Sequence, residues 1–184
     1  MLANDNPHAK RLYDSLISHN EQAAAEEIAR ENPLSKTANA AAKFAWAQGI
    51  CESLESDFSQ EVIKDIRNDC ACGPANSRSD KLRKIYRASD NLDDFAAKAA
   101  AQEHGYTILH EDGALFLVYP KCYCSCVKDV DEPVPTTWCY CTLGYTKRLF
   151  ERVLERPVTA ELIESVKTGG ERCKIKVAWL DTAF

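Results

Sequence analysis

The sequence predicts an α+β protein, with N-terminal helices followed by a four-stranded antiparallel sheet and a covering helix. Apolar residues recur at helical spacing through roughly the first hundred residues, and the pattern changes to two-residue alternation after Gly105. Four strand-like runs then form two hairpins, with one helix between them. We therefore expect a helical segment over residues 1–104 and an α+β domain over residues 105–184, packed as one unit.

The N-terminal helices are predicted from apolar stripes and capping residues. A stripe over residues 9–17 indicates the first helix. Asn20 is the predicted N-cap of a second helix, which stops before Pro33, and Ser35 is the predicted N-cap of a long alanine-rich third helix. Three more helices are predicted over residues 60–68, 79–88 and 92–104.

The strands follow from alternation and turn residues. Runs at 106–110 and 114–119 flank a Glu-Asp-Gly turn, which is a strong hairpin signal. Residues 138–155 then read as a helix, with Thr137 as a plausible N-cap. The last two strands are predicted at 158–166 and 173–179. Two hairpins with a helix between them favour an antiparallel sheet that is covered on one face.

Eight of the nine cysteines fall where a shared metal or redox site would need them. They form three C-x-C clusters and a lone Cys173, and thiolates are the softest metal ligands that proteins offer. Each cluster lies at the end of a predicted element, so loops from one face could bring them together. The predicted metal ligands are Cys70, Cys72, Cys122, Cys124, Cys139, Cys141 and Cys173.

Zinc is the first expectation for the metal, because it accepts four thiolates and needs no assembly machinery. C-x-C is rarer than C-x₂-C in zinc sites, so an iron–sulfur cluster or a thiol relay stays open. Cys139 and Cys141 are placed in the first turn of a helix, where free N–H groups and the helix dipole favour thiolate. Cys51 lies apart, on the alanine-rich helix, as a small core residue.

Composition excludes some partners and locations. The sequence opens without a secretory signal, so we expect the reducing cytosol, where thiol clusters more often bind metal than form disulfides. Structural disulfides remain the alternative, should the chain be exported. A net charge of −5 argues against nucleic acid as a partner. The longest apolar run, residues 114–120, is too short to cross a membrane. A homodimer is left open.

Two sets of residues carry a family resemblance. The stretch WCYCTLGYTKRLFERVLERPVTAELIESVKTGGERCKIKV resembles the end of the 4-vinyl reductase, or hydrocarbon-binding, domain, and the likeness covers roughly residues 105–180. Glu164, Gly169, Gly170 and Cys173 fit its strand, turn and strand pattern. The segments IRNDCACGP, YPKCYCSC and WCYCTLGYTK more closely resemble an uncharacterised family of cysteine-rich bacterial proteins. That family's signature rests on the first two cysteines of the 122–126 cluster, so Cys126 is left out of the ligand set.

The resemblance implies a pocket between sheet and helices, a cysteine-bound metal near it, and a small hydrophobic or aromatic ligand. The chain has more C-x-C pairs than the hydrocarbon-binding domain, so individual ligands do not transfer from it. Two function classes follow. The first is a metal–thiolate protein that binds or senses a small molecule. The second is a thiol- or metal-dependent enzyme, either a hydrolase like the related thiazoline-carboxylate hydrolases or a redox catalyst.

Overall fold

The computed structural model describes residues 6–73, 76–102 and 105–179, and it divides the chain into two compact units. The helical unit contains residues 1–72 and 123–142, and the sheet unit contains residues 73–122 and 143–184. The sequence placed a boundary at residue 104, whereas the compact units exchange segments on both sides of it. Within the described residues, helices precede Gly105 and every strand follows it, so the predicted fold class is confirmed.

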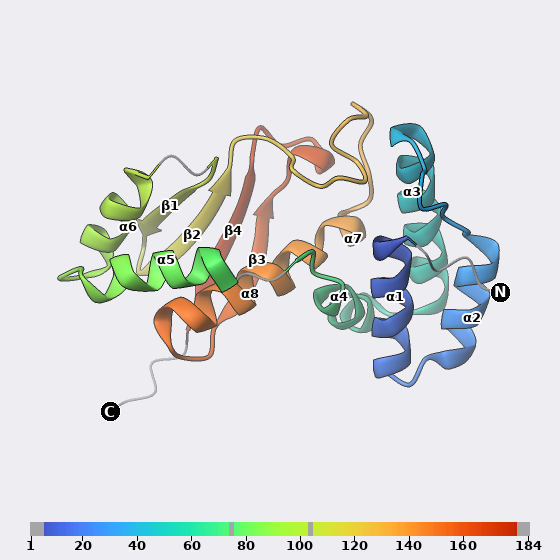
Figure 1. Ribbon diagram of the computed structural model, residues 1–184, viewed down its shortest axis with the longest axis horizontal. Helices are drawn as coiled ribbons and strands as arrows, with labels where there is room; N and C mark the ends of the chain where they lie inside the picture. The colour runs from blue at the N-terminus through green and yellow to red at the C-terminus, as the bar shows by residue number, and fades with distance from the viewer. Residues whose placement is uncertain (1–5, 74–75, 103–104, 180–184) are drawn as a thin grey trace. The chain divides into compact units, whose positions relative to one another are not determined.

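The helical unit is built from five helices of the described chain (Figure 1). Its core consists of the apolar stripes that the sequence pattern indicated, with Leu16, Ile50 and Leu54 almost fully buried. The helices are α1 (Pro7–Ser18), α2 (Gln22–Glu31), α3 (Ala40–Asp57), α4 (Gln60–Asp69) and the one-turn α7 (Thr136–Cys139).

Three helix starts differ from the sequence predictions. Asn39, not Ser35, caps α3, and its side chain accepts from the backbone N–H of Ala42. Asn20 does not cap α2, because it adopts a left-handed conformation with φ of 63° in the preceding turn. Thr137 lies inside α7 and donates its hydroxyl to Glu55, which leaves Pro135 at the cap position.

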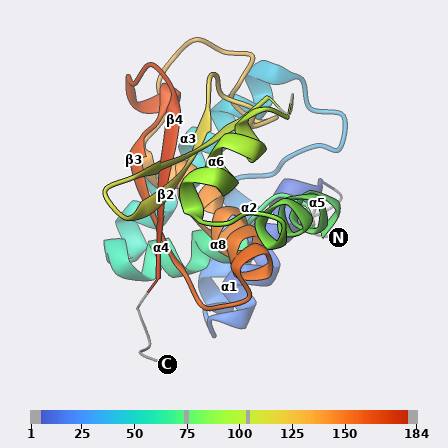
Figure 2. The same cartoon turned by 90° about the vertical axis from the view of Figure 1, so that its left-hand side faces the viewer.

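The sheet unit contains four antiparallel strands in the order β1-β2-β4-β3 (Figures 1 and 2). Asp112 and Gly113 both have positive φ, as a tight hairpin turn between β1 and β2 requires. The predicted helix over 92–104 ends at Ala100, and residues 103–104 lie outside the described residues. The elements are α5 (Asn76–Arg87), α6 (Leu92–Ala100), β1 (Thr107–Glu111), β2 (Ala114–Tyr119), α8 (Cys141–Leu154), β3 (Thr159–Glu164), a 3₁₀ turn (Val166–Thr168) and β4 (Cys173–Ala178).

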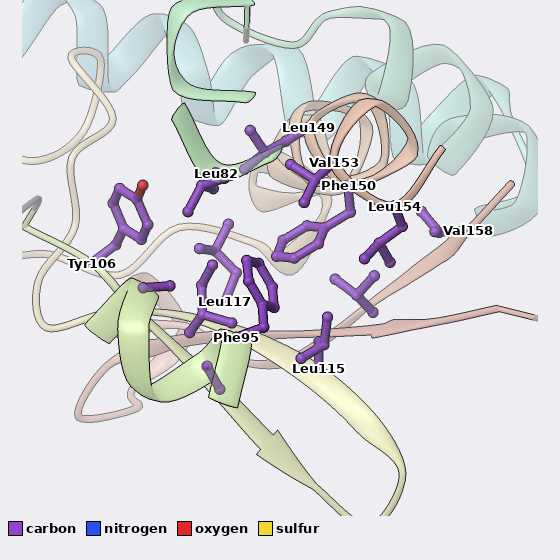
Figure 3. Close-up of a cluster of buried hydrophobic side chains, with 14 residues drawn as sticks. Leu82, Phe95, Tyr106, Leu115, Leu117, Leu149, Phe150, Val153, Leu154 and Val158 are labelled. Atoms are coloured by element: carbon purple, nitrogen blue, oxygen red, sulfur yellow. The ribbon is translucent and has the colours of Figure 1, made fainter. Parts of the chain in front are cut away.

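One face of the sheet packs against α5, α6 and α8 (Figure 3). Phe95 of α6 and Phe150 of α8 fill the centre of this core, against Leu115 and Leu117 of β2, and all four are fully buried. Alternation along β2 sends these leucines to the helices, as the two-residue period predicted. Across the described helices, none is both long and apolar enough to cross a membrane.

Candidate thiolate site of the helical unit

Most of the cysteines belong to the helical unit. Cys122 and Cys173 belong instead to the sheet unit. All nine cysteines are described, and none of them forms a disulfide bond in this structure. The thiols of the helical unit are Cys51, Cys70, Cys72, Cys124, Cys126, Cys139 and Cys141.

The first C-x-C pair ends α4. Cys70 is the C-cap of that helix, and its buried thiol donates to the carbonyl of Ile66 at 3.3 Å. Burial raises the pKa of Cys70, although the Arg67 charge opposes this effect. Cys72 is exposed, and a guanidinium N–H of Arg11 donates to its sulfur at 3.4 Å.

The second cluster lies in a tight turn. Backbone N–H groups of Val127 and Lys128 both donate to the Cys124 carbonyl, at 3.1 and 2.9 Å. The indole N–H of Trp138 donates to the Cys124 sulfur at 3.3 Å, and the Cys126 side chain lies close enough to influence the pKa of Cys124.

The surroundings shift the pKa values of the Cys124 and Cys126 thiols in opposite directions. The hydrogen bond from Cys126, together with that from Trp138, lowers the pKa of Cys124 to about 6 despite partial burial. The same hydrogen bond and burial raise the pKa of Cys126 far above its usual value. At neutral pH, the cluster therefore carries its negative charge on Cys124.

The third cluster corrects a sequence expectation. Cys139 ends α7 and Cys141 begins α8, so the two thiols do not share one helical turn. The pKa of Cys141 is raised, not lowered, because burial outweighs the nearby Arg67 charge and the helix start. Cys139 lies close enough to Cys51 for its charge to raise the pKa of that buried thiol, whose value of about 12 results mainly from burial.

A buried arginine stands among these thiols. Arg67 of α4 is 3% exposed, donates to the carbonyl of Trp138 at 2.9 Å and stacks on its ring at 4.4 Å. Within the described residues it forms no ion pair with a carboxylate, and its Nε has no hydrogen-bond partner. Burial alone would lower the pKa of Arg67, but the charges that the surrounding thiols acquire when they ionise outweigh burial and raise the pKa of Arg67. These thiols are Cys70, Cys141, Cys51 and Cys124.

A neutral histidine joins two of the segments. Burial, and then the charge of Arg11, lowers the pKa of His8 to about 4, so the ring is uncharged at neutral pH. Its Nδ1 accepts from the Arg11 guanidinium at 2.7 Å, and its Nε2 lies 3.0 Å from the Ser125 hydroxyl. The Cys72 sulfur lies 4.0 Å from Nδ1. His8 thus ties α1 to the turn that carries Cys124.

The structure brings four predicted ligands into mutual electrostatic range and adds a fifth thiol, Cys126. The charges of Cys72 and Cys124 affect both Cys126 and Cys141. The described part of the chain contains no group of three or more His, Cys, Asp or Glu side chains spaced to hold a metal ion. The metal-ligand set therefore stays a prediction. Sequence reasoning missed Arg67, His8 and Trp138, which carry no local motif. The four gathered ligands are Cys70, Cys72, Cys124 and Cys141.

Cys173 has a different environment in the sheet unit. It pairs with Tyr119 across β2 and β4, and the charges of Cys173 and Arg78 both affect the Tyr119 hydroxyl. Arg78 donates to the Tyr145 hydroxyl at 2.7 Å and stacks on the Tyr106 ring at 4.7 Å. Tyr106 and Tyr145 therefore bind the Arg78 guanidinium in addition to packing in the core.

A small apolar hollow lies among α1, α2 and α3. Its free volume is about 10 Å³, room for one water molecule, and Leu12, Ile28, Trp46 and Ile50 are among its lining residues. The Trp46 ring meets the Trp138 ring edge-on, at a centroid distance of 5.6 Å. Trp46, which lines the hollow, therefore contacts Trp138, whose indole N–H donates to the Cys124 sulfur.

The pKa of Cys124 gives a direct prediction for metal-free protein. Alkylation of Cys124 by iodoacetamide should rise with pH through a midpoint of about 6, because only the thiolate attacks. A lowered pKa also means that the ionised Cys124 stabilises the fold increasingly above pH 6 and that this contribution is lost below it. Mass spectrometry of the labelled peptide measures the profile. Cys141, whose pKa is raised, is the unreactive control, and a Cys124 midpoint near 9 would contradict the assignment.

Comparison with known proteins places the chain in a family. No curated protein matches it. Among solved structures, one of an H-NOX protein from S. oneidensis in the Fe(II) ligation state is similar at 13% identity and a TM-score of 0.45, over 97% of this chain and 100% of that chain. The finer part of the predicted relationship, to the 4-vinyl reductase domain, stays a prediction. The expectation of an uncharacterised family is confirmed, because the model described as a family of unknown function (DUF6144) matches residues 2–184, and the chain belongs to that family.

Proposed function

We propose that this protein binds a metal ion through the thiols of its helical unit and acts as a binding or sensor protein. The ligands are drawn from Cys70, Cys72, Cys124 and Cys141, with Cys126 beside them. Zinc is the first expectation, because it accepts four thiolates at about 2.3 Å. An iron–sulfur cluster is the alternative metal centre that the same ligands suit.

The single observation that carries the proposal is the buried charge of Arg67. A buried guanidinium without a carboxylate partner is costly unless another negative charge compensates it. Zinc held by four thiolates is a net dianion, and two arginines approach the cluster. Arg67 lies among its buried thiols, and Arg11 contacts Cys72. The charges of the cluster and its arginines would then balance.

Metal binding would require the sulfurs to draw together from their positions in this structure. Cys72 follows the end of α4, and Cys124 lies in a turn, so neither side chain is fixed by a helix. Metal binding also deprotonates thiols, since the thiolate is the ligand. The raised pKa values of Cys70 and Cys141 therefore predict that metal retention weakens as pH falls.

Metal analysis of protein purified without oxygen tests the proposal. We expect about one zinc ion per chain and no visible colour, because Zn²⁺ has a filled d shell. Brown protein that contains iron and sulfide would support the thiolate site but would show that it holds an iron–sulfur cluster in place of zinc. Protein that holds no metal, with every accessible thiol free to alkylate, would overturn the proposal.

Single variants locate the centre. Cys141→Ser should reduce retained metal at least roughly tenfold, because a ligand is lost. Cys51→Ser, on α3 in the same unit, should keep the metal and lower only stability, by about 1–3 kcal/mol if the buried hydroxyl finds no partner. Metal content and melting curves measure both effects. Loss of metal from Cys51→Ser but not from Cys141→Ser would place the site elsewhere.

The ligand-binding part of the proposal concerns the apolar hollow of α1, α2 and α3. We propose a small hydrophobic or aromatic ligand there, as the resemblance to hydrocarbon-binding domains implies, in a cytosolic protein. The contact of Trp46 with Trp138 supports this, because a ligand beside Trp46 would be linked to Cys124. The hollow holds only about one water molecule, about 10 Å³, so its lining side chains must move to admit such a ligand. Titration with a benzene-sized apolar probe should then change tryptophan fluorescence, and Ile28→Phe, which narrows the hollow, should weaken the change.

A further inference from the structure

A half-buried arginine of the sheet unit is held in place by aromatic side chains. Arg78 of α5 donates from Nη1 to the hydroxyl oxygen of Tyr145 in α8, at 2.7 Å. Its guanidinium carbon lies 4.7 Å from the centre of the Tyr106 ring and 5.6 Å from the centre of the Tyr145 ring. Tyr106 is almost fully buried, whereas Arg78 and Tyr145 are half-buried. Two rings and one hydrogen bond therefore fix a guanidinium that solvent still reaches.

The positive charge of Arg78 has no acidic partner among the described residues. None of the ion pairs in that part of the chain includes Arg78. Tyrosine hydroxyls are uncharged at neutral pH, and burial raises the pKa of Tyr106 further, so this phenol does not supply the missing negative charge. The other two arginines of α5, Arg83 and Arg87, both pair with Glu155. Arg78 is therefore the arginine of this helix whose charge is left to an external anion.

Hydrogen-bond donors outnumber acceptors around Arg78. The Tyr145 oxygen accepts from Arg78, so the phenol proton must point to another acceptor, and the described residues provide none. The remaining N–H groups of Arg78 also have no hydrogen-bond partner among the described residues, and they are not among the buried polar atoms left without one. Donors that face solvent beside an unbalanced positive charge suit an anionic acceptor.

We propose that Arg78 and Tyr145 bind a small molecule through a single carboxylate group. The planar guanidinium offers parallel N–H groups that match the two oxygens of a carboxylate, and the Tyr145 hydroxyl adds a further donor. One carboxylate balances the one unpaired charge. A phosphate dianion would need a second cation, and Arg83 and Arg87 already pair with Glu155. The site uses no thiol and belongs to the sheet unit, so it does not depend on the proposed metal centre.

Titration of the full chain with benzoate tests the proposal, and benzamide is the uncharged probe of similar shape. At constant ionic strength, benzoate should cause saturable shifts in the NMR signals of isotope-labelled protein, including the side-chain Nε–H signal of Arg78. Benzamide should bind at least roughly tenfold more weakly, because it offers no negative charge to the guanidinium. Arginine stays protonated at these pH values, so the benzoate affinity should be the same at about pH 6 and about pH 8.

Single variants assign the binding to these two residues. Arg78→Gln should weaken benzoate binding at least roughly tenfold, because a charged donor is lost. Arg87→Gln is the matched control, since it removes the same charge from the same helix at a side chain that already pairs with Glu155, and the affinity should stay within about twofold. Tyr145→Phe keeps the ring, loses the hydroxyl and should weaken binding about threefold to tenfold.

Melting curves check that each variant folds. Arg78→Lys, which keeps the charge and loses the planar fork, carries the test if Arg78→Gln does not fold, and it should also weaken binding roughly tenfold. Four results would overturn the proposal: no saturable shift with benzoate, equal binding of benzamide, unchanged affinity in the folded Arg78 variants, or an equal loss in Arg87→Gln. Inorganic phosphate that binds more tightly than benzoate, and loses that affinity in Arg78→Lys, would overturn the assignment to a carboxylate.

Discussion

Replacing Arg67 with methionine is expected to lower the free energy of unfolding of the metal-loaded protein by about 3 kcal/mol. The variant removes a donor to the Trp138 carbonyl and the guanidinium that stacks on the Trp138 ring. It also removes the positive charge that lowers the pKa values of the Cys70 and Cys141 thiols. Metal retention at neutral pH should fall with it, because the ligands become harder to deprotonate.

The same substitution should cost much less in metal-free protein. Without metal, Cys70 and Cys141 are protonated and need no counter-charge, and the buried Arg67 has no carboxylate partner within the described residues. The difference between the two urea titrations, with and without metal, therefore measures the coupling of Arg67 to the metal–thiolate charge. An equal loss of stability in both forms would mean that Arg67 acts only through Trp138.

Two matched variants sharpen the comparison. Arg67→Lys keeps the charge but loses the planar group that stacks on Trp138, so its stability should fall between wild type and Arg67→Met. Arg11→Met removes the half-buried guanidinium beside Cys72 and should have a smaller effect. A methionine variant that is as stable as wild type and holds the same metal would remove the basis of the proposed function.

The fold could be predicted from the sequence because its signals are local. The period change at Gly105 marks where helices end and strands begin, and the Asp112-Gly113 turn fixes the first hairpin by its positive φ angles. Helix starts were less certain where two capping residues compete. Ser35 and Asn39 are both good N-caps, and the structure begins α3 at the second.

The division into units was beyond sequence reasoning. Residues 123–142 join helices that precede them by more than fifty positions, and no change of composition marks either end. Pairings between distant segments are decided by packing, which no local pattern reports. The same reason explains why Cys122 lies in one unit while Cys124 and Cys126 lie in the other.

The sequence predicted the cysteines of the site but not the other residues that surround them. C-x-C clusters are visible in any sequence, but Arg67 sits in QEVIKDIRND, where it looks like one more surface charge of an amphipathic helix. Helix-dipole reasoning also chose the wrong thiol. A dipole contributes about 0.3–1 kcal/mol at an exposed end, and burial of Cys141 outweighs that. The lowered pKa belongs to Cys124, which receives direct hydrogen bonds.

Phe150→Ala is expected to destabilise the sheet unit by about 3–5 kcal/mol, the cost of a large cavity in a packed core. Phe150 is fully buried between the sheet and the helices that cover it, next to Phe95 and Leu117 (Figure 3). Ile163→Ala in β3 is the matched control. Its side chain is 49% exposed, so the change should stay within about 0.5 kcal/mol. Urea unfolding, followed by pulsed alkylation of Cys173 in β4, reports the sheet unit.

The same variant should weaken the helical unit through chain connectivity. The two segments of that unit are joined by residues 73–122, which belong to the sheet unit. Once the sheet unfolds, the helical unit must close a disordered loop of about 50 residues, at a cost of roughly 3.5 kcal/mol. In Phe150→Ala, the buried Cys126 thiol should therefore become open to alkylation at a lower urea concentration, together with Cys173. The opposite result would be that Cys173 becomes reactive at a lower urea concentration while Cys126 stays protected up to the urea midpoint of the wild-type protein. That result would show that the thiolate site is stable without the sheet.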